Sequence, residues 1–409
     1  MRRGISVFIF ISIIFIVFYS AYSNSSQTKN PAKRAINKTS HIDAQKLYLL
    51  KSTFELRKRC NDFFTRQFNM GNFSGTVLIG YKGEVIYRGA FGYANRKQKM
   101  LMTPQHIFQI GSMSKQFTAI SILQLVASEK LSLNDTVNKF YPDFPYHGIT
   151  IRMLLTHRSG LPNYIYQLEN SSIDKTKPVS NQEMVDYMIK HKEKAYSKPG
   201  RHYQYSNTGY ALLAAIIEKV SGMSFSEYVH KHIFEPLGMN HSFFYTDIFE
   251  NKINASLPIA TGYLSPRQES GFYYLNGILG DKGLFTTIDD LHTWDTSLYH
   301  HYILPINYID SALTKQTKTR LSLISYGFGW KMYFLKDTFA VYFHSGWWQG
   351  YQSVIMHIPH DTVTVVILKN KKTGHPIDQR AMIDLIYPGN NLFNRTAKKN
   401  VFTYHSEQE

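Results

Sequence analysis

The sequence predicts an α/β fold of the α+β type, in which an antiparallel sheet is flanked by N- and C-terminal helices and carries an inserted, mostly helical lobe. Residues 75–93 predict a β-hairpin, because apolar and polar residues alternate on both sides of a turn at Tyr81 to Gly83. Helical patterns dominate from residue 112 to about residue 240. β-rich segments return at about 326–369, so both ends of the chain contribute to the sheet and the middle forms the helical lobe.

Two helices are expected to complete this fold around the sheet. The segment AQKLYLLKSTFELRKRC, at 44–60, and the segment DQRAMIDLIY, at 378–387, lie before and after the strands. We expect them to pack together across the sheet, so that the terminal pieces form one α/β lobe. A single large domain over residues 45–390 accommodates the length of the chain better than several domains do. A polar linker at 24–44 precedes this domain, and a C-terminal tail at 391–409 follows it.

Residues 1–23 are predicted to be a signal peptide or a membrane anchor. Two arginines precede the apolar run ISVFIFISIIFIVFY, and a small-residue pattern that ends at Ser23 suits cleavage before Asn24. The run approaches the length of a membrane span, so attachment to a membrane through residues 5–22 is the alternative. In either case we expect an exported protein, periplasmic or membrane-anchored and facing outside the cytoplasm.

The composition narrows the classes of partner. The single cysteine, Cys60, forms no intramolecular disulfide, so the fold must rest on its hydrophobic core. The 17 histidines do not combine with Cys, Asp or Glu at the spacing of a known metal site, so we expect no metal and no cofactor. Lysine and arginine are spread along the chain despite a net charge of +17, which argues against nucleic acid. A basic exported protein suits an anionic cell envelope, and solubility explains the charge equally well.

The string GSMSK at 111–115 places Ser112 three residues before Lys115 at the start of a predicted helix. Residues three apart share one helix face, so the ammonium group can reach the hydroxyl. Burial lowers the proton affinity of a lysine, which then takes the serine proton near neutral pH. The same spacing recurs at Ser26 and Ser172, but in polar segments with no apolar face to bury a lysine. On this motif alone, an ordinary helix start is an equally good interpretation.

Two further patterns point to a site. Tyr205 and Asn207 come just before a predicted helix that Gly222 ends. A tyrosine near a lysine can act as general base, and an asparagine amide offers a donor and an acceptor to a substrate amide. Tyr-x-Asn recurs elsewhere in the chain and is a weak signal by itself. The β-rich residues 339–343 then run into a His-Ser-Gly string that begins at His344, which we expect to form a strand edge lining a cleft.

In this order, Ser-x-x-Lys, Tyr-x-Asn and His-x-Gly resemble the serine β-lactamase and penicillin-binding protein superfamily. The resemblance is to its class C branch, which includes DD-peptidases, D-aminopeptidases and esterases. The strings FQIGSMSKQFTA, ITIRMLLTHRSGLP, GLFTTIDDLHTW and SYGFGW support it, and it extends over about residues 45–390. It implies a β-lactamase/transpeptidase-like fold.

The resemblance also implies roles for single residues. Ser112 is the acylated nucleophile, Lys115 its activating partner, and Tyr205 the base that returns a proton to the leaving group. The backbone N–H groups of Ser112 and Trp347 form the oxyanion hole. The implied substrate-binding residues are Asn207, His344, Ser345, Gly346 and Trp347. Trp347 and Trp348 form either an aromatic wall beside the acyl pocket or ordinary packing.

A second candidate for the strand motif occurs at Lys372 to Gly374, where the sequence reads Lys-Thr-Gly. Its segment is polar and follows a β-rich run, so it predicts a turn that leads into the last helix. The runs after His344 instead predict a three-strand antiparallel edge. A histidine at 344 is mostly neutral at pH 7, whereas a lysine would offer a fixed positive charge. Peptide substrates are therefore expected more than efficient β-lactam hydrolysis.

These observations predict an exported serine hydrolase that forms an acyl-enzyme on Ser112 with an amide or ester. The expected activities are those of a D-alanyl-D-alanine carboxypeptidase, a D-aminopeptidase or an esterase. The alternative is a penicillin-binding or wall-peptide-sensing protein that is acylated but turns over little. The expected partner is a small molecule or peptide, including fragments of the cell wall. The loops at 164–182 and 240–280 are expected to select the substrate.

Overall fold

The computed structural model describes most of the predicted domain. The described residues are 52–254, 256–318, 324–336, 339–374 and 378–389. The predicted signal peptide or anchor, the linker and the C-terminal tail lie outside them. The chain divides into two units, residues 1–56 and 57–409, and residues 52–56 of the first unit are helical. Within the described ranges, no helix combines the length and the apolar character needed to cross a membrane. The second unit contains the sheet and the helical lobe.

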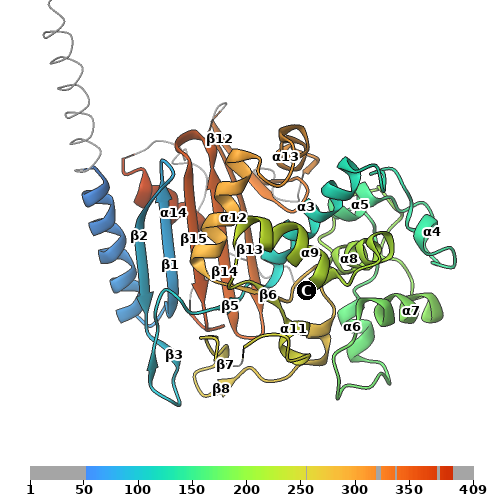
Figure 1. Cartoon of the computed structure of the whole chain (residues 1–409), viewed down its shortest axis with the longest axis horizontal. Coiled ribbons are helices and arrows are strands. Elements are labelled where there is room, and N and C mark those ends of the chain that lie inside the picture. Colours follow the sequence, from blue (N-terminus) through green and yellow to red (C-terminus); the bar gives the residue numbers. More distant parts are fainter. Residues whose placement is uncertain (1–51, 255, 319–323, 337–338, 375–377, 390–409) are drawn as a thin grey trace, which may run out of the picture. The chain divides into compact units, whose positions relative to one another are not determined.

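An eight-stranded antiparallel sheet forms its centre, in the order β10-β11-β12-β13-β14-β15-β1-β2 (Figure 1). The predicted hairpin is present as β1 (Gly75–Tyr81) and β2 (Glu84–Phe91). β15 (Val363–Lys369) pairs with β1 on one side and with β14 (Tyr351–Ile358) on the other. The hairpin from the N-terminal region therefore completes a sheet that the C-terminal third of the chain builds, as predicted.

The strand that carries His344 is β13 (Phe339–Trp348), and it pairs with β14. β13, β14 and β15 pair antiparallel, as predicted, but they do not form an edge of the sheet, because three more strands continue it beyond β13. These are β10 (Thr317–Lys318), β11 (Ile324–Tyr326) and β12 (Lys331–Lys336). β12 pairs with β13 only as far as Lys331 opposite Phe343. Within the described residues, the last part of β13, from His344 to Trp348, therefore has an open side.

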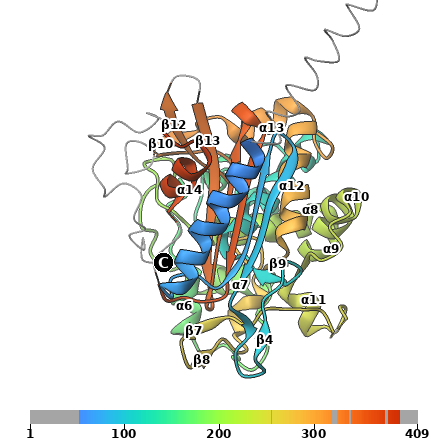
Figure 2. The same ribbon diagram turned by 90° about the vertical axis from the view of Figure 1, so that its left-hand side faces the viewer.

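Helices cover both faces of the sheet. α12 (Ile288–His300) packs against β1 and β15 on one face, and α14 (Gln379–Ile386) lies on the opposite face, as the side view shows (Figure 2). The helix that ends at residue 69 joins α14 there, because Arg59 Nε donates a hydrogen bond to Leu385 O at 3.2 Å. This covering on two sides explains why every residue of β15 is buried.

The helix before the hairpin ends at residue 69 rather than at residue 60, and the part of the prediction at 44–51 lies outside the described residues. Phe64 explains the difference. Its ring is buried and lies 5.2 Å from that of Phe73 and 6.3 Å from that of Phe91. This packing extends the helix beyond the sequence pattern that predicts it.

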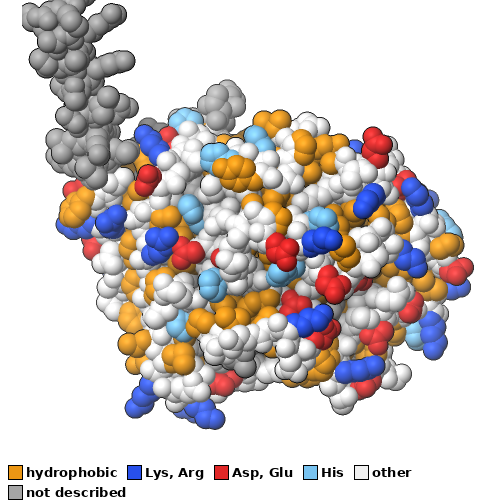
Figure 3. Space-filling view, viewed as in Figure 1, with side chains coloured by type: hydrophobic (Ala, Val, Ile, Leu, Met, Phe, Trp, Pro, Cys, Tyr) orange, Lys and Arg blue, Asp and Glu red, His pale blue; other side chains and the backbone are white. Residues whose placement is uncertain are grey.

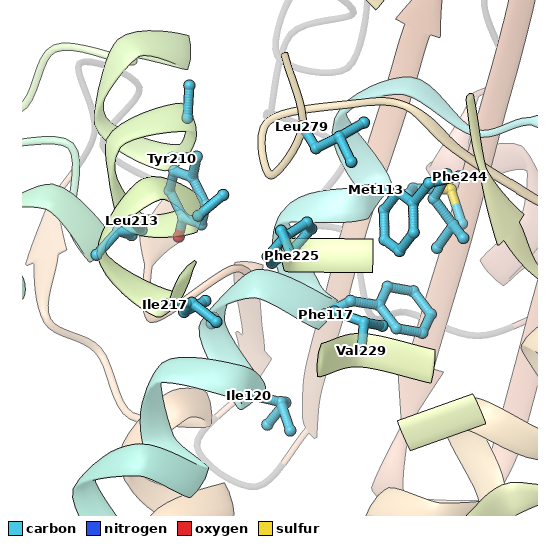
Figure 4. Close-up of a cluster of buried hydrophobic side chains, with 14 of the residues drawn as sticks. Met113, Phe117, Ile120, Tyr210, Leu213, Ile217, Phe225, Val229, Phe244 and Leu279 are labelled. Atoms are coloured by element: carbon cyan, nitrogen blue, oxygen red, sulfur yellow. The ribbon is translucent and has the colours of Figure 1, made fainter. Parts of the chain in front are cut away.

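The helical lobe is built around α3 (Ser114–Ala127) and α8 (Asn207–Ser221). Figure 4 shows Phe117 and Ile120 of α3 in one buried cluster with Leu213 and Ile217 of α8. Ser206 caps α8 by accepting a hydrogen bond from the Gly209 N–H, and Gly222 ends the helix in a left-handed conformation, as predicted. Both helices begin at the site, so this core fixes where their first residues lie.

The remaining elements are short, apart from α7. The helices are α4 (Val137–Phe140), α5 (Ile151–Leu155), α6 (Tyr164–Glu169), α7 (Asn181–His191), α9 (Phe225–Val229), α10 (Glu235–Leu237), α11 (Tyr245–Phe249) and α13 (Ile306–Leu313), with the single turns η1 (Gly111–Met113), η2 (His230–Phe234), η3 (Tyr274–Gly277) and η4 (Pro359–Asp361). The strands are β3 (Tyr93–Asn95), β4 (Met100–Leu101), β5 (Phe108–Gln109), β6 (Phe243–Phe244), β7 (Tyr263–Ser265), β8 (Gln268–Glu269) and β9 (Leu284–Thr286).

The surface and the single thiol agree with the composition. On the face shown in Figure 3, lysine and arginine side chains are interspersed with aspartate and glutamate. Cys60 is fully buried, and burial raises the pKa of its thiol to about 12. A thiol in this state is protonated at neutral pH, so it is not a nucleophile.

Candidate active site

Ser112 and Lys115 lie at the junction of η1 and α3, where the chain turns into the central helix of the lobe. Lys115 Nζ lies 2.9 Å from Ser112 Oγ, so the predicted pair is within hydrogen-bond distance. The lysine is fully buried, and the serine retains 7% of its surface. The helix spacing thus aligns the pair, and the surrounding core removes the lysine from water.

Two further oxygens hold the lysine amine. Lys115 Nζ lies 2.8 Å from Asn207 Oδ1 and 2.9 Å from the backbone oxygen of Asp281. A neutral amine has two N–H donors and one lone pair. If the two N–H groups bind these oxygens, the lone pair points to the Ser112 hydroxyl. An ammonium group can instead donate to all three oxygens, so the same geometry accommodates the lysine before and after it accepts a proton.

Tyr205 lies beside this pair. Lys115 Nζ is 5.0 Å from the centre of the Tyr205 ring, and Lys331 Nζ, on β12, is 5.4 Å from it. The buried His157 ring supports the tyrosine at 4.3 Å, and His157 Nδ1 accepts a hydrogen bond from the Ser206 N–H. Positive charge near a phenol stabilises its ionised form, which is the form a general base needs.

β13 packs directly onto the serine turn at two glycines. A Cβ added to Gly346 would lie 1.8 Å from Ile110 O, and one added to Gly111 would lie 2.9 Å from Trp347 N. Ser353 on β14 also donates a hydrogen bond to Ile110 O at 2.7 Å. The absence of side chains at the two glycines therefore brings the backbone of Trp347 next to the turn that holds Ser112, where the oxyanion hole is predicted.

His344 is fully buried, and both of its ring nitrogens have partners in the protein. Nδ1 donates to Ser345 O at 2.8 Å, which leaves Nε2 to accept from the Tyr326 hydroxyl at 3.1 Å. Burial and the nearby Lys331 and Lys115 ammonium groups hold the pKa of His344 well below its usual range. The ring is thus neutral and enclosed by protein, so the predicted binding of substrate by the His344 side chain requires a rearrangement.

The other predicted residues of the strand differ in exposure. Ser345 Oγ is buried and, among the described residues, has no hydrogen-bond partner. This atom is shielded from solvent, so the predicted binding of substrate by Ser345, like that by His344, requires a rearrangement. Trp347 is 38% exposed, whereas Trp348 is buried and donates from its indole N–H to Asn276 Oδ1 at 2.6 Å. Of the two interpretations, an aromatic wall fits Trp347 and ordinary packing fits Trp348.

The Lys-Thr-Gly string at 372–374 lies in a bend after β15, outside any strand. Lys372 is exposed, and its ammonium group lies 4.9 Å from the centre of the Trp347 ring. The Lys-Thr-Gly string therefore lies outside the strand next to the serine. The prediction that His344 to Gly346, and not this string, form the strand motif is consistent with this position. In the described part of the chain, no three or more His, Cys, Asp and Glu residues cluster in a way that could hold a metal ion.

Several residues of the site were not predicted from the sequence. Asp281 supplies the third oxygen around Lys115, and Lys282 and Tyr164 lie buried next to it. His157 and Lys331 flank Tyr205. The available signal is the string GDKG before GLFTTIDDLHTW, because two adjacent charges between glycines are unusual in an otherwise apolar segment.

This fold and site, with a buried lysine next to a serine and a tyrosine ring beside the lysine, are those of a family of serine hydrolases. Comparison with known proteins agrees with this class. Residues 63–385 match the family model described as Beta-lactamase. The chain belongs to this family, as the resemblance of its motifs predicts.

Individual relatives show how far the similarity extends. The chain is 33% identical to a penicillin-binding protein of Bacillus subtilis (strain 168) over 337 residues, which cover 79% of this chain and 74% of the relative. A solved structure, an octameric penicillin-binding protein homologue from Pyrococcus abyssi, is 32% identical with a TM-score of 0.66 and covers 76% of this chain and 73% of its own. The D-amino acid amidase of Ochrobactrum anthropi SV3 shares the fold, with a TM-score of 0.65 and 24% identity over 79% of this chain and 92% of its own.

Proposed function

We propose that this protein is an exported serine hydrolase that forms an acyl-enzyme on Ser112 with an amide or ester substrate. The 2.9 Å contact between Ser112 Oγ and the buried Lys115 Nζ carries this proposal. A hydroxyl becomes a nucleophile when a neighbouring base removes its proton, and burial lowers the proton affinity of a lysine. Membership of the beta-lactamase family supports the same chemistry.

The proposed reaction has two halves. In the first, Lys115 accepts the Ser112 proton while Oγ bonds to the substrate carbonyl carbon, and the backbone N–H groups of Ser112 and Trp347 stabilise the oxyanion. Tyr205 then donates a proton to the leaving amine or alcohol as the carbonyl carbon releases it. In the second half, the Tyr205 phenolate removes a proton from water and the hydroxide attacks the acyl carbonyl carbon. The bond from that carbon to Ser112 Oγ then breaks, and Lys115 returns its proton to Ser112 Oγ.

The proposed substrates are peptides or amides that end in D-amino acids, or esters, including fragments of the cell wall. The neutral and buried His344 supports this choice over efficient β-lactam hydrolysis, because the strand offers no fixed charge at that position. The exposed ring of Trp347 is suited to an apolar side chain of such a substrate. The names of the penicillin-binding relatives are consistent with such substrates.

Export is proposed from the sequence of residues 1–23. A charged start, an apolar run and a small-residue cleavage pattern direct a chain out of the cytoplasm, either free in the periplasm or attached through residues 5–22. Fractionation of cells that produce the full chain tests this, with the mature N-terminus read by mass spectrometry. Recovery of the uncleaved chain in the cytoplasm would contradict export.

The activity is tested with four reagents on purified protein and on the Ser112→Ala variant. These are a fluorophosphonate probe, a p-nitrophenyl ester, a D-Ala-D-Ala peptide and nitrocefin. We expect labelling at Ser112 and turnover of the ester or the peptide, with both lost in the variant. Labelling of Ser112 without turnover of any substrate would instead identify an acylatable sensor, and turnover that survives in Ser112→Ala would refute the site.

A further inference from the structure

Two charged side chains lie buried directly behind the lysine of the site. Asp281 is 1% exposed and Lys282 is 2% exposed, with Lys282 Nζ 3.4 Å from Asp281 Oδ1. They occupy the loop between η3 and β9. The only part of this loop assigned to the active site so far is the backbone oxygen of Asp281, which binds Lys115. Removing two charges from water costs free energy that their attraction does not always recover. We therefore asked which function this buried ion pair has next to the active site.

The pair belongs to a fully buried network with Tyr164 on α6. The Tyr164 hydroxyl donates to Asp281 Oδ2 at 2.9 Å and accepts from Lys282 Nζ at 2.5 Å. Lys282 Nζ also donates to Ile278 O at 3.0 Å. The Tyr164 N–H donates to Thr208 Oγ1 at 3.0 Å, and Thr208 follows Asn207 in α8. The network thus connects the loop to the helix that supplies an acceptor for Lys115.

The same network contacts the other two parts of the site. The backbone oxygen of Asp281 accepts a hydrogen bond from Lys115 Nζ at 2.9 Å. Lys282 Nζ lies 5.1 Å from the centre of the Trp348 ring, which follows Trp347 in β13. Through two backbone groups and one side chain, these three residues therefore contact α3, α8 and β13, where the nucleophile, the base and the oxyanion hole are proposed to meet.

We propose that Asp281, Lys282 and Tyr164 form a positioning network that orients the Lys115 amine and sets the pH at which it becomes a base for Ser112. This inference rests on the proposed function, in which Lys115 activates the serine. The backbone oxygen of Asp281 binds one N–H of the amine, so the lone pair is directed at the hydroxyl. The carboxylate of Asp281 stabilises the ammonium form of Lys115, and the ammonium group of Lys282 opposes it.

Other titratable groups also face Lys115 and set the baseline against which the pair acts. They come from α8 and the residues before it, from the segment after α5, and from β11, β12 and β13. Tyr205, Tyr210, His157 and His344 interact with Lys115 itself. Lys331 and Tyr326 act on Tyr205 and His344 in turn. All of these residues are kept in the variants of the pair, so the difference in pH profile between wild type and variant reports the pair.

The test measures the second-order rate of fluorophosphonate labelling at Ser112 as a function of pH. Loss of the negative charge in Asp281→Asn lowers the proton affinity of Lys115, so the acidic limb of the profile moves down by about one pH unit. Loss of the positive charge in Lys282→Met moves it up by about the same amount, the size expected for one charge several ångströms away in a protein. The double variant returns close to the wild-type limb.

Controls separate this role from a structural one. Asp295→Asn removes another buried carboxylate, which binds His357 on the sheet, and it is expected to leave the limb unchanged. Tyr164→Phe keeps both charges, and it tests the network if the Asp281 and Lys282 variants do not fold. It is expected to lower the plateau rate about 10-fold with the limb unmoved, because the amine is less well oriented.

The inference is overturned if the acidic limb of the pH profile stays in place in both single variants, or moves in the same direction in both. Labelling of the wild-type protein at Ser112 would still support the proposed function in that case. An unchanged plateau in Tyr164→Phe overturns it as well. If the wild-type protein is not labelled at Ser112, the proposed function is refuted, and the network inference, which rests on it, is refuted as well.

Discussion

Gly346→Ala tests how closely β13 must lie on the serine turn. The added methyl group would sit 1.8 Å from Ile110 O and 2.6 Å from Ser353 Oγ, and the first atom belongs to the backbone. Relief to the 3.4 Å of an ordinary contact requires a displacement of about 1.6 Å. The adjacent Trp347 N–H moves with the strand, and a hydrogen bond stretched by that much is lost.

The expected loss of rate follows from this displacement. Removing one oxyanion-hole donor typically costs about 10²- to 10³-fold, and overpacking a buried site costs roughly 1–3 kcal/mol of stability. The rate of fluorophosphonate labelling at Ser112 and the melting temperature are measured together. Gly271→Ala is the matched control, because a Cβ there has nothing within 4 Å. A folded Gly346→Ala protein that is labelled within about two-fold of the wild-type rate would refute the reasoning.

Three further predictions follow from the same geometry. Tyr205→Phe is expected to slow turnover about 10²- to 10⁴-fold, because the phenol activates water, and an unchanged deacylation rate in rapid-mixing experiments contradicts this role. Burial holds the pKa values of His157 and His344 well below those of an unfolded chain. The unfolded state thus binds more protons below about pH 6.5, and stability falls from pH 6.5 to pH 5 by up to about 2 kcal/mol per histidine. An equal or higher stability at pH 5 in urea titrations would contradict the assignment of both rings as neutral. Cys60, with a pKa of about 12, is expected to resist thiol reagents at pH 8 until the protein unfolds, and rapid reaction in the native state would be inconsistent with its burial.

Local spacing explains what the sequence predicts well. Ser112 and Lys115 lie one helical turn apart, so their contact depends on neighbouring residues alone. The hairpin of β1 and β2 and the capped helix α8 are also local patterns. The three short motifs occur along the chain in the order that the resemblance implies. Their residues come together at one site in the folded protein.

Contacts between distant segments explain what the sequence does not predict. The backbone oxygen of Asp281 lies 166 positions from Lys115 along the chain, and a carbonyl group carries no sequence signal. The low pKa of His344 depends on burial and on Lys331 and Lys115, which approach from β12 and α3. β10 and β11 have only two and three residues and do not stand out as strands, and strand order in a sheet depends on pairing between segments, so the central position of β13 was missed.

The most direct measurement of the central claim is the labelling rate of Ser112 in the wild-type protein and in Lys115→Met, with the labelled residue identified by peptide mass spectrometry. Met fills a similar volume but offers no base, so we expect labelling at Ser112 in the wild type and a rate about 10²- to 10⁴-fold lower in the variant. Labelling on another residue, or an equal rate at Ser112 without the lysine, would contradict the account.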